Sequence, residues 1–200
     1  MNTLKRLMVY CYLLLSFTAC KQDDDVSKII PIKEYESCCG AEPVELRFTT
    51  GQYLYVPNSF TPNKDGINDI WYPVFSSGQD KIQAFFIYTL EDNTLIHQMY
   101  EYHLYPAGTY GWDGTKSRNG QNLGDNSLHK GGFWYEIFFN EPVNVGNEEI
   151  AFKGRACAIA CDKDAAYFKD KEGCFFPVQV NAQGSLDNTI KAGEESCFGK

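Results

Sequence analysis

The chain has 200 residues, a formal net charge of −8 and an aromatic content of 15%. This length accommodates one generous domain, or one domain with a small appendage. The acidic balance, with no clustered run of Lys and Arg, argues against nucleic acid as a partner, because phosphate binding needs such a cluster. Many Tyr, Phe and Gly residues with a moderate charge content are typical of a folded β protein with many turns.

The first segment has the pattern of a secretory signal peptide. Lys5 and Arg6 precede an apolar run over residues 7–19, which is too short to span a bilayer, since a membrane helix needs about 20 residues. Ala19 stands directly before Cys20, and this arrangement resembles the lipobox of bacterial lipoproteins. The resemblance implies a signal peptide over residues 1–19, cleavage after it, and lipidation of Cys20. The alternative is an ordinary signal peptide that is cleaved at another position.

An acidic tether is expected over residues 20–43. Three consecutive acids, Asp23, Asp24 and Asp25, repel one another and extend a linker. Acids directly after a lipidated cysteine also resemble the surface-export signal of Bacteroidota lipoproteins. That resemblance implies a lipid-anchored protein of the outer membrane that is exposed on the cell surface, whereas the alternative is a simple solvated linker.

Residues 44–160 alternate between apolar and polar side chains in short runs separated by turn residues, which is the pattern of β-strands. About six to eight strands at this spacing predict an all-β fold, an antiparallel β-sandwich. A carboxy-terminal extension, residues 161–200, follows, in which residues 162–171 are compatible with a short charged helix. The expected strands are Val44–Thr49, Gln52–Val56, Ile82–Leu90, Leu95–Tyr100, Phe133–Phe139, Glu149–Ala158 and, in the extension, Phe175–Val180.

Six cysteines remain once Cys11 leaves with the signal peptide and Cys20 carries lipid. An even number in an exported chain predicts three disulfides, because that compartment is oxidising, and these would staple both ends of the chain to the sandwich. The spacing leaves the pairing open, although adjacent cysteines are expected to have different partners. A zinc site that uses Cys157 and Cys161 is the alternative, but no His lies near them in the sequence. The disulfide candidates are Cys38, Cys39, Cys157, Cys161, Cys174 and Cys197.

Residues 55–69 read Tyr-Val-Pro-Asn-Ser-Phe-Thr-Pro-Asn-Lys-Asp-Gly-Ile-Asn-Asp. This motif resembles the opening of the gliding motility-associated C-terminal domain family, which is also the type B sorting domain of the type IX secretion system in Bacteroidota. Later landmarks of the family recur in order at residues 86–88, 112–115, 132–135 and 152–154. The resemblance implies an Ig-like sandwich over residues 44–160 in a Bacteroidota envelope. Such a domain normally ends its protein, whereas residues 161–200 follow it here, so we expect a role in folding and contact in place of sorting.

The loop inside this motif is the strongest candidate for a ligand site. Asn63, Asp65 and Asp69 alternate around a glycine, and Ile67 offers a backbone carbonyl, a set of hard oxygen ligands that suits Ca²⁺. The loop lacks the bidentate Glu of an EF-hand, so Asp113 of the Trp-Asp-Gly turn is a candidate additional ligand. The alternative is a tight loop in which Asp and Asn side chains bond to their own backbone.

The sequence lacks a paired nucleophile and base, a His-Glu-x-x-His motif and a phosphate-binding glycine loop, so it is not expected to be an enzyme. His97, His103 and His129 have no ligand spacing and are expected on the surface. The leading hypothesis is a non-enzymatic cell-surface lipoprotein whose Ig-like domain contacts another protein of the outer-membrane envelope, for example in gliding or type IX secretion machinery. The alternatives are a glycan- or matrix-binding adhesion module and a lipid-anchored hydrolase.

Overall fold

The computed structural model describes residues 35, 38, 41–48, 51–76, 82–100, 111–116, 127–143, 149–162, 165 and 173–198. All of them belong to one compact unit, residues 31–200. The predicted signal peptide, the lipidation site Cys20 and the acids Asp23–Asp25 lie outside the described residues. Within the described ranges, no helix is long and apolar enough to cross a membrane.

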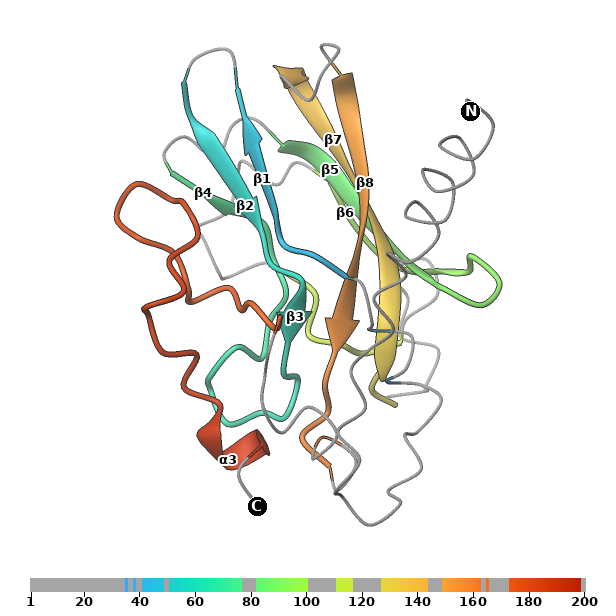
Figure 1. Ribbon diagram of the computed structural model, residues 1–200. Helices are drawn as coiled ribbons and strands as arrows, with labels where there is room; N and C mark the ends of the chain where they lie inside the picture. The colour runs from blue at the N-terminus through green and yellow to red at the C-terminus, as the bar shows by residue number, and fades with distance from the viewer. Residues whose placement is uncertain are drawn as a thin grey trace, which may run out of the picture. The chain divides into compact units, whose positions relative to one another are not determined.

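Two β-sheets face each other across an apolar core, as Figure 1 shows. Their strands are β1 (Val44–Arg47), β2 (Tyr53–Val56), β3 (Ser59–Phe60), β4 (Val74–Phe75), β5 (Ile82–Thr89), β6 (Leu95–Tyr100), β7 (Gly131–Val143) and β8 (Glu149–Ala158), and a short helix α3 (Glu195–Phe198) lies near the end of the chain. The smaller sheet has the order β1-β2-β4, and the larger sheet has the order β3-β8-β7-β5-β6. The prediction of an all-β sandwich is confirmed.

One strand pair departs from the antiparallel pattern. β3 runs parallel to β8, with Ser59 opposite Cys157 and Phe60 opposite Ala158, whereas the other named pairs are antiparallel. Parallel neighbours need a long connection, and here the chain between them includes four strands of the sandwich. The motif at residues 55–69 therefore starts in one sheet and enters the other through β3.

Two tryptophans occupy the centre of the core. Trp71 and Trp112 are fully buried, and their backbones exchange two hydrogen bonds of 2.9 Å each. Each indole N–H has an acceptor, the carbonyl of Pro57 for Trp71 and that of Thr115 for Trp112. Both rings pack edge-on against Phe133 of β7. Buried aromatic rings with satisfied N–H groups contribute large apolar area at no polar cost, which explains why the Trp-Asp-Gly turn is fixed to the sandwich.

The period-two pattern located most strands well. Leu95–Tyr100 and Glu149–Ala158 are strands with the predicted bounds. The strand predicted at Phe133–Phe139 is longer in the structure, because β7 starts at Gly131 and its first two residues already pair with β8. Most of residues 162–171, the predicted charged helix, lies outside the described residues.

The predicted strand Phe175–Val180 is wrong. Gln179 N donates to the carbonyl of Phe176 at 3.0 Å, and the side chain of Gln179 accepts the N–H of Phe176 at 2.9 Å. These bonds form a turn. Pro177 lies inside it and explains the error, because proline has a fixed φ and no N–H for a sheet ladder.

A second apolar cluster lies apart from the sandwich core and joins both ends of the unit to β8. It contains Tyr35, Cys38, Cys157, Ile159, Ala165, Phe176, Cys197 and Phe198. Disulfides link Cys38 to Cys157 and Cys161 to Cys197. Both pairings confirm the predicted staples, and they exclude the zinc alternative for Cys157 and Cys161 in this oxidised chain. Cys174 packs half-buried against the cluster, and Cys39 lies outside the described residues.

Candidate functional site

The motif loop folds back on its own amide groups. Asp69 accepts hydrogen bonds from the N–H of Lys64 and, at 2.6 Å, from the N–H of Gly66. Asp65 accepts the N–H of Ile67 at 2.9 Å, and Asn63 accepts the N–H of Asp65 at 3.0 Å. These are the side-chain-to-backbone bonds that stabilise tight turns. The side-chain oxygens of this loop that were proposed as calcium ligands thus already have amide partners, and the carbonyl of Ile67 accepts the hydroxyl of Thr61 at 3.4 Å. Calcium would have to compete with these bonds, and the self-bonded loop and the calcium site remain the two alternatives.

The proposed additional ligand, Asp113, serves a second turn. Its carboxylate accepts the backbone N–H of Thr115 at 3.0 Å and the hydroxyl of Thr115 at 2.6 Å. This turn lies against the start of the motif loop, because a Cβ on Gly114 would stand 2.8 Å from Cβ of Pro62. The two turns are therefore neighbours, and each acid stabilises the turn in which it stands.

The carboxy-terminal extension covers the base of the motif loop. Glu194 is fully buried, and its carboxylate accepts the hydroxyl of Thr61 at 2.5 Å and the side-chain amide of Asn68 at 2.9 Å. The same amide donates to the carbonyl of Ala192 at 2.8 Å. Asn68 has a φ of 47°, a left-handed conformation that Asn tolerates better than most residues. The loop and the extension are held together by buried polar bonds across a long stretch of chain.

Asn58 joins the motif to both flanking segments. Its side-chain N–H₂ donates to the carbonyl of Ala41 at 2.9 Å and to that of Gly173 at 2.6 Å, and its side-chain oxygen accepts the N–H of Phe175 at 2.7 Å. Tyr55 adds a longer bond, 3.4 Å from its hydroxyl to the carbonyl of Phe176. The side chains of Asn58 and Tyr55 are thus hydrogen-bonded to the segments that flank the sandwich, at residue 41 and at residues 173–176.

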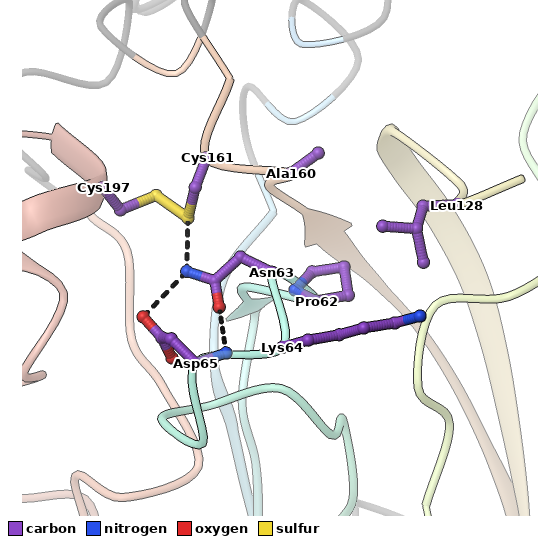
Figure 2. Close-up of a pocket in the computed structure, with 8 residues that line it drawn as sticks. All are labelled: Pro62, Asn63, Lys64, Asp65, Leu128, Ala160, Cys161 and Cys197. Atoms are coloured by element: carbon purple, nitrogen blue, oxygen red, sulfur yellow. Dashed lines mark hydrogen bonds between the residues drawn. A yellow bond between two sulfur atoms is a disulfide. The ribbon is translucent and has the colours of Figure 1, made fainter.

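A pocket opens beside the motif loop and the Cys161–Cys197 disulfide (Figure 2). The side-chain amide of Asn63 lies between Sγ of Cys161, 3.2 Å away, and the carboxylate of Asp65, 2.9 Å away. Lys64 extends away from the disulfide, as Figure 2 shows. The carboxylate of Glu194 and both sulfur atoms lie within 4.8 Å of one another, but the sulfur atoms are bonded to each other. The pocket contains no nucleophile activated by a base among the described residues.

The histidines differ from the expectation that they lie on the surface. His129 is buried and its Nε2 lies 3.0 Å from the carbonyl of Gly132. His97 is half-buried as a residue, yet its Nε2 is shielded from solvent. Burial lowers the pKa of His97 from 6.5 to about 4, and the charge of Asp113 opposes part of that change. Burial also lowers the pKa of His129. Both rings are therefore neutral packing groups, and His103 lies outside the described residues.

The outward side of the larger sheet, which we call the outer face, is rich in aromatic side chains. Along β7, Trp134, Glu136 and Phe138 are half-buried and alternate with buried residues of the core. Strand pairing places them in three rows, namely Tyr88-Trp134-Arg155, Phe86-Glu136-Lys153 and Ala84-Phe138-Ala151. Phe86 packs edge-on against Tyr100 and Phe138, and Tyr100 is 57% exposed.

Two cations lie over the aromatic rings of this outer face. The ammonium of Lys153 lies 5.5 Å from the ring centroid of Trp134 and 5.8 Å from that of Tyr88. The guanidinium of Arg155 lies 5.4 Å from the Trp134 ring. Burial, reinforced by the charge of Glu136, raises the pKa of Tyr88, so its hydroxyl stays protonated and donates to Glu136. Cation–π contacts hold the charged groups close to the sheet.

The sequence analysis identified the motif loop as a candidate site but did not identify the outer face. The alternating pattern of this face is visible in the sequence, because every second residue in 134–138 and 151–155 belongs to it. That alternation shows only that these residues share a face with one another, however, and the pairing of Lys153 with Glu136 needs the register. No sequence pattern marks Glu194 as a buried acid, since its hydrogen-bond partners Thr61 and Asn68 lie 133 and 126 residues away in the sequence.

Comparisons with known proteins add no family to this picture. No protein-family model, curated protein or solved structure matches the chain. The resemblance of residues 55–69 to the gliding motility-associated domain family therefore stays a prediction.

Proposed function

We propose that this protein is a non-enzymatic lipoprotein, anchored in the outer membrane through Cys20, that binds another envelope protein through the outer face of its larger sheet. The observation that carries the proposal is the group of Trp134, Tyr88, Lys153 and Arg155 on that face. Trp, Tyr and Arg dominate the binding energy of protein interfaces, and aromatic residues with Arg are enriched there.

Placement in the envelope is supported by the ends of the chain. The basic start, the short apolar run and the Ala-Cys pair at residues 19–20 favour export and lipidation. Two disulfides fit an oxidising compartment. The motif at residues 55–69 favours a Bacteroidota envelope, so gliding or type IX secretion components are the first partners to examine.

A contact role is favoured over a sorting role by what the motif does inside the chain. Asn58 and Tyr55 bond to residues 173–176, and Thr61 and Asn68 bond to Glu194. A sorting receptor would have to displace these buried bonds, each of which is costly to leave unmade. The extension and the lipid anchor thus both support a domain that is retained at the membrane.

Purification of the lipoprotein from native outer membrane in mild detergent tests this proposal. We expect the wild-type chain to co-purify with one outer-membrane protein, and the Trp134→Ala variant to lose it. Lys191→Glu, an exposed change in the extension, is the matched control and should keep the partner. Recovery of the lipoprotein alone would contradict the proposal.

A glycan-binding role is the second candidate, and Tyr100 favours it. This ring is 57% exposed and continues into Phe86 and Phe138 across three strands. Exposed aromatic rings can stack on sugars. Retention of the wild-type lipoprotein on an immobilised polysaccharide, lost in Tyr100→Ala, together with recovery of no protein partner, would establish this role in place of the first.

A further inference from the structure

One edge of the larger sheet is paired over only a small part of its length. β8 runs from Glu149 to Ala158, but β3 pairs only with Cys157 and Ala158. No other described strand pairs with residues 149–156 on this side of β8. Figure 1 shows β3 beside one end of β8 only. The strand therefore offers a row of backbone groups that its neighbours in the described sheet do not use.

The direction of these backbone groups follows from the bonds to β3. The N–H of Cys157 donates to the carbonyl of Asn58 at 2.8 Å, and the N–H of Ile159 donates to the carbonyl of Phe60 at 3.0 Å. Successive N–H groups of a strand point to opposite sides. The N–H groups of Ala151 and Lys153 therefore point toward the same edge as that of Cys157.

The residues with edge-facing N–H groups also carry the side chains of the outer face. Ala151 stands opposite Phe138, Lys153 opposite Glu136 and Arg155 opposite Trp134. An incoming strand would place its side chains about 5 Å from those of its neighbour, so residues of the added strand that share the outer face would meet the side chains of β8. Those nearest the edge include the exposed Lys153 and the half-buried Arg155.

We propose that the edge of β8 at residues 149–156 accepts an extended, acidic segment of the partner protein as an additional strand. The inference rests on the proposed function and specifies how the partner binds. Main-chain bonds to Ala151 and Lys153 supply affinity, and carboxylates opposite the exposed Lys153 supply specificity. The rings of Trp134 and Tyr88 keep the ammonium of Lys153 on the outer face, beside the added strand.

The charge of this edge argues against a second copy of the chain as the occupant. Pairing of two β8 edges would bring Lys153 and Arg155 of one copy close to the same cations of the other. Like charges on facing strands are destabilising. An acidic segment has the opposite effect. The chain as a whole is acidic, with a net charge of −8. The two cations are therefore a local basic feature, and they favour a partner segment that is negatively charged.

Amide hydrogen exchange on the full mature chain in detergent tests the inference. The probe is a synthetic peptide that alternates Glu with Val, and the matched control peptide alternates Lys with Val. We expect the Glu peptide to slow exchange at Ala151 and Lys153 by about tenfold or more, and the Lys peptide to leave it unchanged. Lys153→Glu should reverse this preference, whereas Lys191→Glu should not alter it.

A proline variant separates strand addition from other binding at the outer face. Ala151→Pro removes an N–H that points to the edge that no described strand covers at this residue, so the ladder to β7 keeps its bonds. We expect it to abolish the effect of the Glu peptide. Co-purification of the partner with Ala151→Pro, but not with Trp134→Ala, would overturn strand addition and leave the proposed function standing. If the partner co-purifies with both variants, strand addition and the proposed function are both overturned.

Three results would contradict the inference directly. Unchanged exchange with the Glu peptide would mean that the cations only keep the edge from pairing, a common use of Lys on edge strands. Concentration-dependent protection of the same amides without peptide would identify a second copy as the occupant. Protection that disappears when Asp23–Asp25 are replaced by Ser would identify the chain's own tether.

Discussion

Thr61 donates its hydroxyl to the carboxylate of Glu194 at 2.5 Å, across 133 residues of sequence. Glu194 has no exposed surface, and Asn68 donates to the same carboxylate oxygen. A buried acid with two side-chain donors fixes the extension to the motif loop. The extension is thereby part of the folded unit that carries the candidate site.

Glu194 should contribute strongly to stability. Glu194→Ala leaves Thr61 and Asn68 buried without this acceptor, so we expect a loss of about 2–4 kcal/mol in the free energy of unfolding. Urea denaturation measures it, and hydrogen exchange should show residues 185–198 opening first. Its neighbour Glu195 is exposed, and Glu195→Gln is the control, with an expected change near zero. Equal effects of the two variants would contradict a role for the buried bonds.

Acid should destabilise the fold through His97. The pKa of this ring is about 4 in the folded state and about 6.5 in the unfolded chain. Protons therefore bind the unfolded chain more tightly, and the stability present above pH 6.5 falls as the pH decreases toward 4. The shift corresponds to roughly 3 kcal/mol, and His129 acts in the same direction.

The control for this pH dependence is His97→Phe, which keeps an aromatic ring beside Phe85. Thermal unfolding followed by circular dichroism between pH 7 and pH 4 should show a shallower decline in the variant. A decline of the same steepness in both proteins would show that His97 is not the titrating group.

The motif loop should keep its shape without calcium. The side-chain oxygens of Asn63, Asp65 and Asp69 accept amide protons of the loop itself, and calcium would have to compete with these bonds. We therefore expect the melting temperature to be the same in EDTA and in millimolar calcium. A rise with calcium that is lost in Asp65→Ala would instead support a calcium site at this loop.

A third disulfide is expected between Cys39 and Cys174. The side chain of Asn58 donates to the carbonyls of both Ala41 and Gly173. Ala41 is two residues after Cys39 and Gly173 directly precedes Cys174 in the sequence, so the segments that contain the two cysteines meet at this side chain. Peptide mapping by mass spectrometry under non-reducing conditions should recover the 39–174 link beside the links 38–157 and 161–197. Alkylation of either thiol in the oxidised mature protein would contradict it.

Local patterns predicted what local physics controls. Alternating side chains located β6 and β8 to the residue, because a half-buried strand needs that period. The same rule failed at Phe175–Val180, where Pro177 cannot donate to a sheet ladder and Gln179 closes a turn with Phe176. The contacts between Thr61 and Glu194 and between Lys153 and Trp134 could not be predicted from the sequence, since both depend on how the fold places distant segments side by side.

The central claim is that the outer face of the larger sheet contacts another envelope protein in living cells. A photo-crosslinking aromatic residue in place of Tyr100, the exposed ring of the outer face, and in a second strain at position 191, tests it on the intact surface. We predict a discrete adduct with one outer-membrane protein from position 100 and none from position 191. No adduct at position 100, or the same adducts from both positions, would contradict the claim.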